Sequence, residues 1–277
     1  LLTATIRRDG FSGFAANEKY AQFPSLAVAW NINNESFFNA DWMNTLKLRA
    51  SYGSNGNLTS RYRSLDSVSA GAAYVFGDGG NTLFGQQVQT LSNPNLRWEK
   101  TTGVNIGVDF TLLNNRILGS IDYYNNKTND LLFDVAIPAV TGFTIIRTNV
   151  GNVKNKGIEL SLNSTNLRTK NFEWSTTLNI SRNTNKIVRL VGLDANGDGI
   201  EDDLVASNLF IGKSIETIYQ YQTDGIYQLN ETIPAGYSPG TFRIVDQTKD
   251  GNITTADRII LGRQEPAYRF SILNTFR

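Results

Sequence analysis

The sequence contains no histidine and no cysteine, and its single methionine is Met43. Their absence excludes Ser-His-Asp and Cys-His catalysis, disulfides and thiolate chemistry, and it removes the usual ligands of most zinc and non-haem iron sites. Neither charge sign dominates, because 26 basic and 25 acidic residues leave a formal net charge of +1. No nucleic-acid partner is therefore implied. No apolar run approaches the roughly 18 residues of a membrane-spanning helix.

What the sequence does contain is alternation of apolar and polar residues, the period of a β-strand with one buried face. No segment shows a convincing helical period. The alternation is clearest in five segments, 46–53, 104–110, 117–124, 158–163 and 174–181, and weaker in 2–8, 24–32 and 268–276. Leu48, Val104, Ile106, Leu160 and Leu178 share the apolar parity, whereas Lys47, Arg49, Asp109, Asp122 and Glu159 share the other. The pattern predicts an all-β, antiparallel protein.

The connections between these segments alternate in length. Residues 111–115 and 164–172 make short connections, whereas 54–101, 125–156 and 182–267 make long ones. Globular domains rarely tolerate several structureless loops beyond about 15 residues. Outer-membrane barrels combine short turns on one side with long loops on the other. The alternation therefore favours an up-and-down transmembrane β-barrel with long extracellular loops.

The tryptophans agree with a barrel. Trp30, Trp98 and Trp174 share the apolar parity of their segments and stand near the segment ends. An outer-membrane barrel places its aromatic girdles at these positions. The alternative is that they are ordinary core tryptophans of a β-sandwich.

Longer strings identify a family. In order along the chain they are "LLTATIRRDGFSGF", "FPSLAVAW", "LKLRASYGSNGN", "NPNLRWEKTTGVNIGVDFTLLNNRILGSIDYYNNKTNDLL", "TNVGNVKNKGIELSLNS", "WSTTLNISRNTNKI" and "DRIILGRQEPAYRFSILNTFR". Together they closely resemble the C-terminal barrel half of SusC/RagA-type TonB-dependent outer-membrane transporters. The resemblance covers nearly the whole chain and is weakest at 58–90 and 190–240.

The resemblance implies a fold and a location. Residues 1–277 would form the C-terminal portion of a larger plugged barrel, supplying about nine of its roughly 22 strands in the bacterial cell outer membrane. Outer-membrane lipid would cover the apolar face. The plug domain and TonB box are absent from these residues, so we expect the chain alone neither to close a barrel nor to transport anything.

The resemblance also implies a function. The family imports glycans or peptides with energy from TonB, and each transporter works beneath a SusD-like surface lipoprotein. The expected ligand is therefore an oligosaccharide or a peptide, and the expected protein is no enzyme and has no cofactor. Two alternatives stay open: a structural or adhesive outer-membrane barrel, and a soluble glycan-binding β-sandwich.

One motif suggests a metal. Residues 246–257 follow the spacing of an EF-hand loop, although "TFRIV" before it and "RIILG" after it predict strands instead of helices. Gly251 stands at the turn position. The candidate calcium ligands are Asp246, Thr248, Asp250, Asn252 and Asp257. Asp257 replaces the usual bidentate glutamate, and Thr248-Lys249 replaces an Asn-Gly pair typical of the resembled family. The alternative is a polar turn whose carboxylates accept backbone amides.

Three further motifs have simpler interpretations. "DANGDG" at 194–199 is a shorter echo of the same loop, and we interpret it as a turn. The acidic run Glu201, Asp202 and Asp203 lacks a catalytic partner, so we interpret it as a solvated loop and not as an acid–base pair. "GDGG" at 77–80 lacks the strand-then-helix context of a phosphate-binding loop.

Overall fold

A computed structural model describes residues 1–14, 17–58, 64–75, 82–143, 145–234 and 236–277; the "GDGG" motif at 77–80 lies outside them. The main strands are β1 (Leu2–Gly10), β2 (Tyr20–Asn31), β3 (Met43–Asn57), β6 (Glu99–Leu112), β7 (Ile117–Ala136), β8 (Ile145–Arg168), β9 (Glu173–Arg189) and β14 (Arg269–Phe276). They form one eight-stranded sheet in the order β1-β2-β3-β6-β7-β8-β9-β14, with antiparallel neighbours throughout. The sequence predicted about nine strands, and each of its eight predicted segments overlaps one of these.

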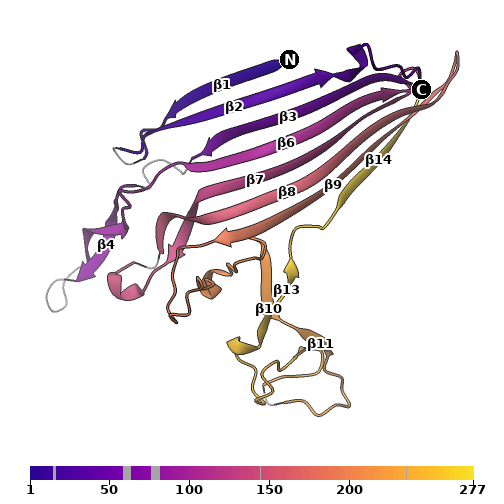
Figure 1. Cartoon of the computed structure of the whole chain (residues 1–277). Coiled ribbons are helices and arrows are strands. Elements are labelled where there is room, and N and C mark those ends of the chain that lie inside the picture. The colour runs from indigo at the N-terminus through magenta and orange to yellow at the C-terminus, as the bar shows by residue number, and fades with distance from the viewer. Residues whose placement is uncertain (15–16, 59–63, 76–81, 144, 235) are drawn as a thin grey trace.

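The sheet is open, as a partial barrel should be, and its strands run side by side with a common twist (Figure 1). Three two-stranded ribbons lie in the connections. They pair β4 (Ser67–Val75) with β5 (Thr82–Thr90), β10 (Thr217–Tyr221) with β13 (Arg258–Arg263), and β11 (Thr223–Ile226) with β12 (Phe242–Ile244). The strands predicted on both sides of the EF-hand-like loop are thus β12 and β13.

Helices are few and short. Among the described residues there are four 3₁₀ turns: η1 (Ile32–Asn34), η2 (Ala139–Thr141), η3 (Val205–Ser207) and η4 (Thr255–Asp257). None of the helices in the described part of the chain is both long and apolar enough to cross a membrane.

The long connections share one edge of the sheet. Antiparallel neighbours in chain order place every second connection at the same end. Residues 58–98 and 190–268 leave from one end, and the short turns 113–116 and 169–172 lie at the other, together with both termini (Figure 1). This confirms that the two longest predicted connections share one edge of the sheet, opposite the short turns.

One predicted boundary is wrong. The segment 125–156 is not a loop, because β7 continues to Ala136 and β8 begins at Ile145, which leaves a connection of residues 137–144. Part of the extension, such as "NNKTND", is polar on both faces, whereas Val153 in "NVKNK" lies in a buried cluster against which Leu131 and Phe133 pack. A strand without one regular apolar face keeps its ladder of hydrogen bonds but loses the alternation that sequence reasoning relies on.

The main sheet has an apolar face, defined by the parity of Val104, Tyr123, Ile158 and Ile180, and a polar face, defined by the opposite parity. Leu48, Val104 and Ile106 are exposed, as the prediction of an uncovered apolar face requires. The buried clusters lie elsewhere. One contains Phe14, Phe23, Leu96 and Trp98, and the other contains Val153, Ile187, Leu190 and Leu209.

Two of the three tryptophans lie where a girdle needs them. Trp30 and Trp174 are exposed near the short-turn end, and Trp174 stacks on Phe276 with ring centroids 5.9 Å apart. The prediction that Trp98 belongs to a girdle is wrong. It is 9% exposed, it contacts Phe23, and its indole N–H donates to the Lys19 carbonyl at 3.2 Å. Its neighbours Lys19 and Phe23 come from the β1–β2 connection and from β2, and the parity of Trp98 alone could not reveal them.

Candidate functional site

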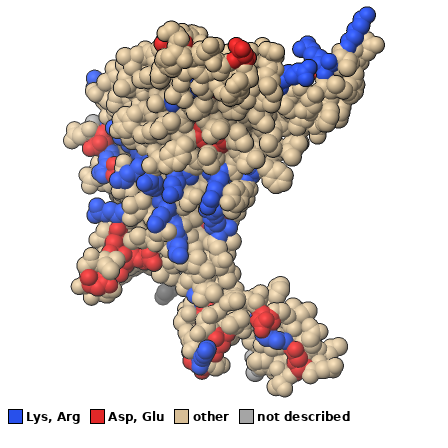
Figure 2. Space-filling model, turned by 45° about the vertical axis from the view of Figure 1, so that its right-hand side comes forward, with Lys and Arg blue, Asp and Glu red and all other residues tan. Residues whose placement is uncertain are grey.

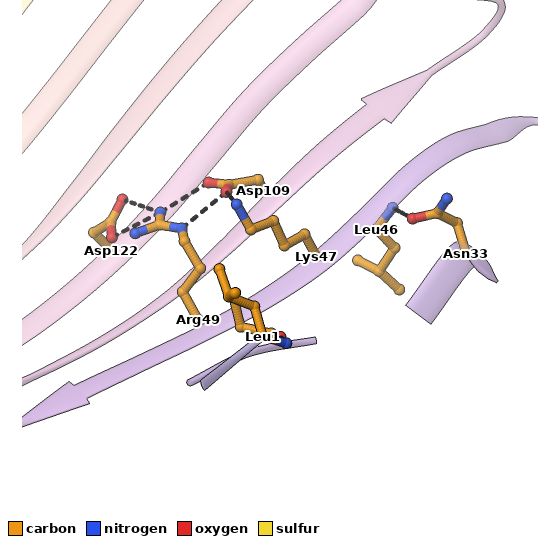
Figure 3. Close-up of polar contacts among 8 residues, drawn as sticks. Leu1, Asn33, Leu46, Lys47, Arg49, Asp109 and Asp122 are labelled. Carbon is orange, nitrogen blue, oxygen red and sulfur yellow. Dashed lines mark hydrogen bonds and ion pairs between the residues drawn. The ribbon is translucent and has the colours of Figure 1, made fainter. Parts of the chain in front are cut away.

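The polar face carries a charged network near the middle of the sheet. Arg49 on β3 donates from Nε and Nη2 to the two carboxylate oxygens of Asp109 on β6, both at 2.8 Å. The same Nη2 lies 2.9 Å from the carboxylate of Asp122 on β7. Lys47 approaches Asp109 at 3.9 Å (Figure 3). Two cations therefore face two anions across three strands, so the network compensates its own charge.

Gly107 makes the reach from β3 to β7 feasible. It lies on β6 directly between its cross-strand neighbours Arg49 and Asp122. A Cβ at this position would stand 2.6 Å from Arg49 Nη2 and 2.4 Å from Asp122 Oδ1. Because atoms cannot approach that closely, any side chain at 107 would push the guanidinium or the carboxylate away.

A shallow hollow of about 360 Å³ continues the polar face toward β14. Ser161 donates to Asn179 at 2.9 Å within it. Its polar lining includes Asp122, Glu159, Ser161, Asn179, Arg269 and Ser271. Hydroxyl, amide, carboxylate and guanidinium groups together offer donors and acceptors of both charges. Such a surface suits a polar solute or another polar protein segment.

The EF-hand-like loop is closed by backbone amides. The carboxylate of Asp257 is fully buried and accepts from the amide nitrogens of Thr254 at 2.7 Å, Gln247 at 3.0 Å and Thr248 at 3.1 Å. These bonds, from Thr254 foremost and then from Thr248, hold the pKa of Asp257 at about 2. Asp246 likewise accepts from the amides of Lys249 and Gly251.

The turn thus brings Asp246, Thr248 and Asp257 together, and backbone amides already satisfy both of these carboxylates. Asp250 and Asn252 are exposed on the loop surface. In the described part of the chain no three acidic side chains gather in an arrangement that would hold a metal ion. The calcium site stays a prediction, because amide bonds to a carboxylate do not preclude a cation on its other lone pairs.

The backbone of this loop fits its sequence only in part. Gly251 has φ of 82°, the left-handed region that glycine enters freely. Lys249 also has a left-handed φ, 58°. A lysine in this conformation costs about 1 kcal/mol or more.

The other acidic motifs serve the backbone too. Asp194 accepts from Gly197 at 2.8 Å and from Gly199 at 2.9 Å, so 194–199 forms the turn that its sequence favours. The interpretation of residues 201–203 as a merely solvated loop is wrong, because all three carboxylates accept backbone amides. Glu201 accepts from the Leu190 amide at 2.9 Å, Asp202 from Ala195 and Asp203 from Ile211. A sequence gives no sign of which distant amides a carboxylate will meet.

Comparison with known proteins places this arrangement in a family. Residues 1–258 match the model of the TonB dependent receptor-like β-barrel. The chain belongs to that family. The receptors of this family lie in the bacterial outer membrane, and so does this chain. Its apolar face is therefore the lipid-facing side of a barrel wall, and its polar face lines the lumen.

Relatives agree on the family. The chain is 39% identical over 289 residues to TonB-dependent receptor P26 of Formosa agariphila, a match that covers 99% of this chain and 28% of that receptor. It is 34% identical over 269 residues to TonB-dependent receptor SusC of Bacteroides thetaiotaomicron, covering 94% of this chain and 26% of SusC. The chain thus spans little more than a quarter of the length of these receptors.

A solved structure confirms the fold. The structure of the RagAB peptide transporter superposes with a TM-score of 0.74 at 25% identity, covering 98% of this chain and 29% of that one. The open eight-stranded sheet is thus similar to a segment of a larger barrel wall. The sequence-based recognition of a SusC/RagA-type barrel is confirmed.

Proposed function

We propose that this chain forms part of the wall of an outer-membrane, TonB-dependent importer of peptides or oligosaccharides. The observation that carries the proposal is the contrast between the two faces of one sheet. One face is apolar and uncovered, and the other holds the Arg49 network and the polar hollow. A wall between lipid and a polar passage needs this contrast. Its role is to bind and pass a solute, not to catalyse a reaction.

Uptake tests the proposal in the intact receptor. Cells that carry the full-length receptor, or lack its gene, would be given labelled peptides and labelled oligosaccharides in separate experiments. We expect loss of uptake for one of the two classes in the deleted strain. We also expect Glu159→Gln with Arg269→Gln, in the hollow, to lower uptake several-fold, whereas Lys170→Gln, in the turn at 169–172, leaves it unchanged. Normal uptake of both classes without the gene would refute the proposal.

The same proposal includes a SusD-like surface lipoprotein that closes over the long-connection edge. The ribbon of β11 and β12 supports it, because it lies far from the main sheet (Figure 1) and exposes large apolar side chains. Leu229, in the connection between β11 and β12, is 84% exposed, and Phe242 on β12 is 68% exposed. Exposed apolar clusters on a surface of this kind mark protein contacts.

Co-purification tests the lipoprotein contact. We expect a surface lipoprotein to co-purify with the native receptor and to be lost with Leu229→Ser and Phe242→Ser. Val140→Ser removes an equally exposed apolar side chain from the β7–β8 connection and serves as the control. Retention of the lipoprotein by the double variant would move the contact elsewhere.

A further inference from the structure

Basic side chains cluster on the apolar face, at the level where the sheet gives way to the long connections. The residues are Lys100 on β6, Lys127 on β7, Lys154 and Lys156 on β8, and Arg182 and Lys186 on β9. We call them the basic band. Figure 2 shows lysine and arginine gathered between the largely uncharged body of the molecule and the loops. Their parity is that of the lipid-facing residues, so the band points out of the barrel.

The band follows the edge of the apolar surface from strand to strand. Lys127 stands four residues beyond Tyr123, Lys156 two beyond Ile158, and Arg182 two beyond Ile180. At about 3.3 Å per residue, these steps place the charges roughly 7–13 Å past the apolar edge. That height is where lipid headgroups begin.

Without a counter-charge, the basic band destabilises the sheet. Lys127 is the direct cross-strand partner of Lys154, and Lys154 is the direct partner of Lys186. Like charges directly opposite one another in a sheet repel. Within the described residues none of the six basic side chains forms an ion pair, and the acidic side chains of the polar face point the other way. Among the described residues no carboxylate compensates the row, so an anion bound from outside would stabilise it.

A hollow lies among these lysines. It has a volume of about 450 Å³, within the roughly 300–1,000 Å³ of small-molecule sites, and Lys154, Lys156 and Lys186 line it. One wall is Ile211 and Gly212. Gly212 donates to the carbonyl of Ile187 at 2.9 Å, and the Ile187 amide donates to the carbonyl of Lys213 at 2.8 Å. Backbone bonds thus fix the wall against β9.

We propose that the basic band binds the phosphorylated headgroups of lipid in the cell-surface leaflet, with one phosphate in the hollow between Lys154 and Lys186. The band is continuous with the lipid-facing surface, it bears one sign of charge, and it lies at headgroup height. Lysine ammonium groups bind phosphate as compact point charges. A juxtamembrane basic cluster attracts anionic lipid by the same physics. Thr184 and Val188 line the hollow beside the charges and would contact the sugar of such a lipid.

The test uses the purified full-length receptor in non-ionic detergent. Bacterial lipid A and its dephosphorylated form are titrated in parallel, and bound lipid is measured by native mass spectrometry. We expect the wild type to prefer the phosphorylated form and to lose that preference as ionic strength rises. K154Q/K186Q should weaken binding about 30-fold, the product of roughly fivefold to sixfold for each charge removed. R116Q/K170Q, at the short-turn end, should leave it unchanged.

Two further measurements keep the outcome decisive. K154R/K186R keeps both charges and should bind like the wild type, which separates charge from folding. The thermal unfolding temperature of K154Q/K186Q in lipid-free detergent should not fall below that of the wild type, because the substitutions remove repulsion. Equal binding of the two lipid forms by the wild type, or unchanged binding by K154Q/K186Q, would overturn the proposal. Loss of a co-purifying protein in place of lipid would assign the band to a protein contact and overturn it too.

Discussion

The two faces of the main sheet treat basic side chains in opposite ways. On the polar face, Arg49 has a bidentate carboxylate partner and a second carboxylate in reach. On the apolar face, Lys127, Lys154 and Lys186 face one another in a row. A charge that lines a barrel must find its counter-charge in the protein, whereas a charge at the lipid edge can find it in the membrane. Compensation of charge therefore distinguishes the faces as well as hydropathy does.

The largest expected effect comes from reversing the faces. Leu160→Arg places a charge in the middle of the apolar face, between Ile121 and Ile180, and should destabilise the intact receptor by about 2–4 kcal/mol. Ser161→Arg, one residue along and on the polar face, should cost much less. Urea unfolding of both full-length variants in lipid vesicles measures the difference. Equal losses would mean that the faces are wrongly assigned.

The next largest effect is expected from a substitution that removes the shared cation of the polar network. Arg49→Met leaves Asp109 and Asp122 without their shared cation, and we expect a loss of about 2 kcal/mol, the scale of hydrogen bonds to charged groups. Lys154→Met is the matched change on the other face. It should be nearly neutral or slightly stabilising in uncharged detergent, since it relieves repulsion. A larger loss for Lys154→Met than for Arg49→Met would reverse the comparison.

A smaller effect concerns a charge compensated by amides alone. The pKa of Asp257 is lowered from 3.8 to about 2, so the folded loop favours the carboxylate form. Its contribution is complete above pH 4 and is lost as the pH falls from 3.8 toward 2. Over this range the hydrogen-exchange protection of residues 246–257 in the full-length receptor, measured relative to the intrinsic exchange rate at each pH, should fall. Asp257→Asn should show the low protection at every pH, and a wild type without pH response would contradict the assignment.

The smallest expected effect is calcium binding by the same loop. We expect a dissociation constant of roughly 10⁻⁴–10⁻³ M, as in weak extracellular sites. Calcium should slow proteolysis between β12 and β13 in the full-length receptor, and removal of calcium with a chelator should restore it. Asp250→Ala should abolish the effect without loosening the loop in the absence of calcium. If calcium protects neither protein, the loop is a turn and nothing more.

Much of the fold was predictable because lipid and lumen impose alternation. The segments 104–110 and 158–163 lie inside β6 and β8 for this reason. Among the missed residues 125–136 and 145–156 the alternation is lost, because "NNKTND" is polar on both faces and Leu131, Phe133 and Val153 pack in a cluster outside the regular pattern. The basic band was missed with them, because Lys127, Lys154 and Lys156 fell in a predicted loop.

The polar network of Arg49, Asp109 and Asp122 could not be predicted from the sequence either. Arg49, Asp109 and Asp122 could be assigned to one parity, yet only the register brings them into contact across Gly107. The glycine itself was a usable signal, since a glycine inside a strand often marks a close approach. The loop at 246–257 was recognised from its spacing. The spacing did not show that Asp257 would be buried with its carboxylate bonded to backbone amides.

An ion pair near the tip of the β7–β8 hairpin has a consequence for assembly. The connection between β7 and β8 lies on the long-connection side, so its tip must cross the bilayer as the strands insert. Near that tip Asp134 is the direct cross-strand partner of Arg147, and their side chains form an ion pair at 2.6 Å. The pair leaves the tip of the hairpin without a lone charge as the tip crosses hydrocarbon, where a lone charge is costly. Insertion of newly made receptor, followed by pulse-chase, should therefore be slower for Asp134→Asn than for the doubly neutral Asp134→Asn with Arg147→Gln.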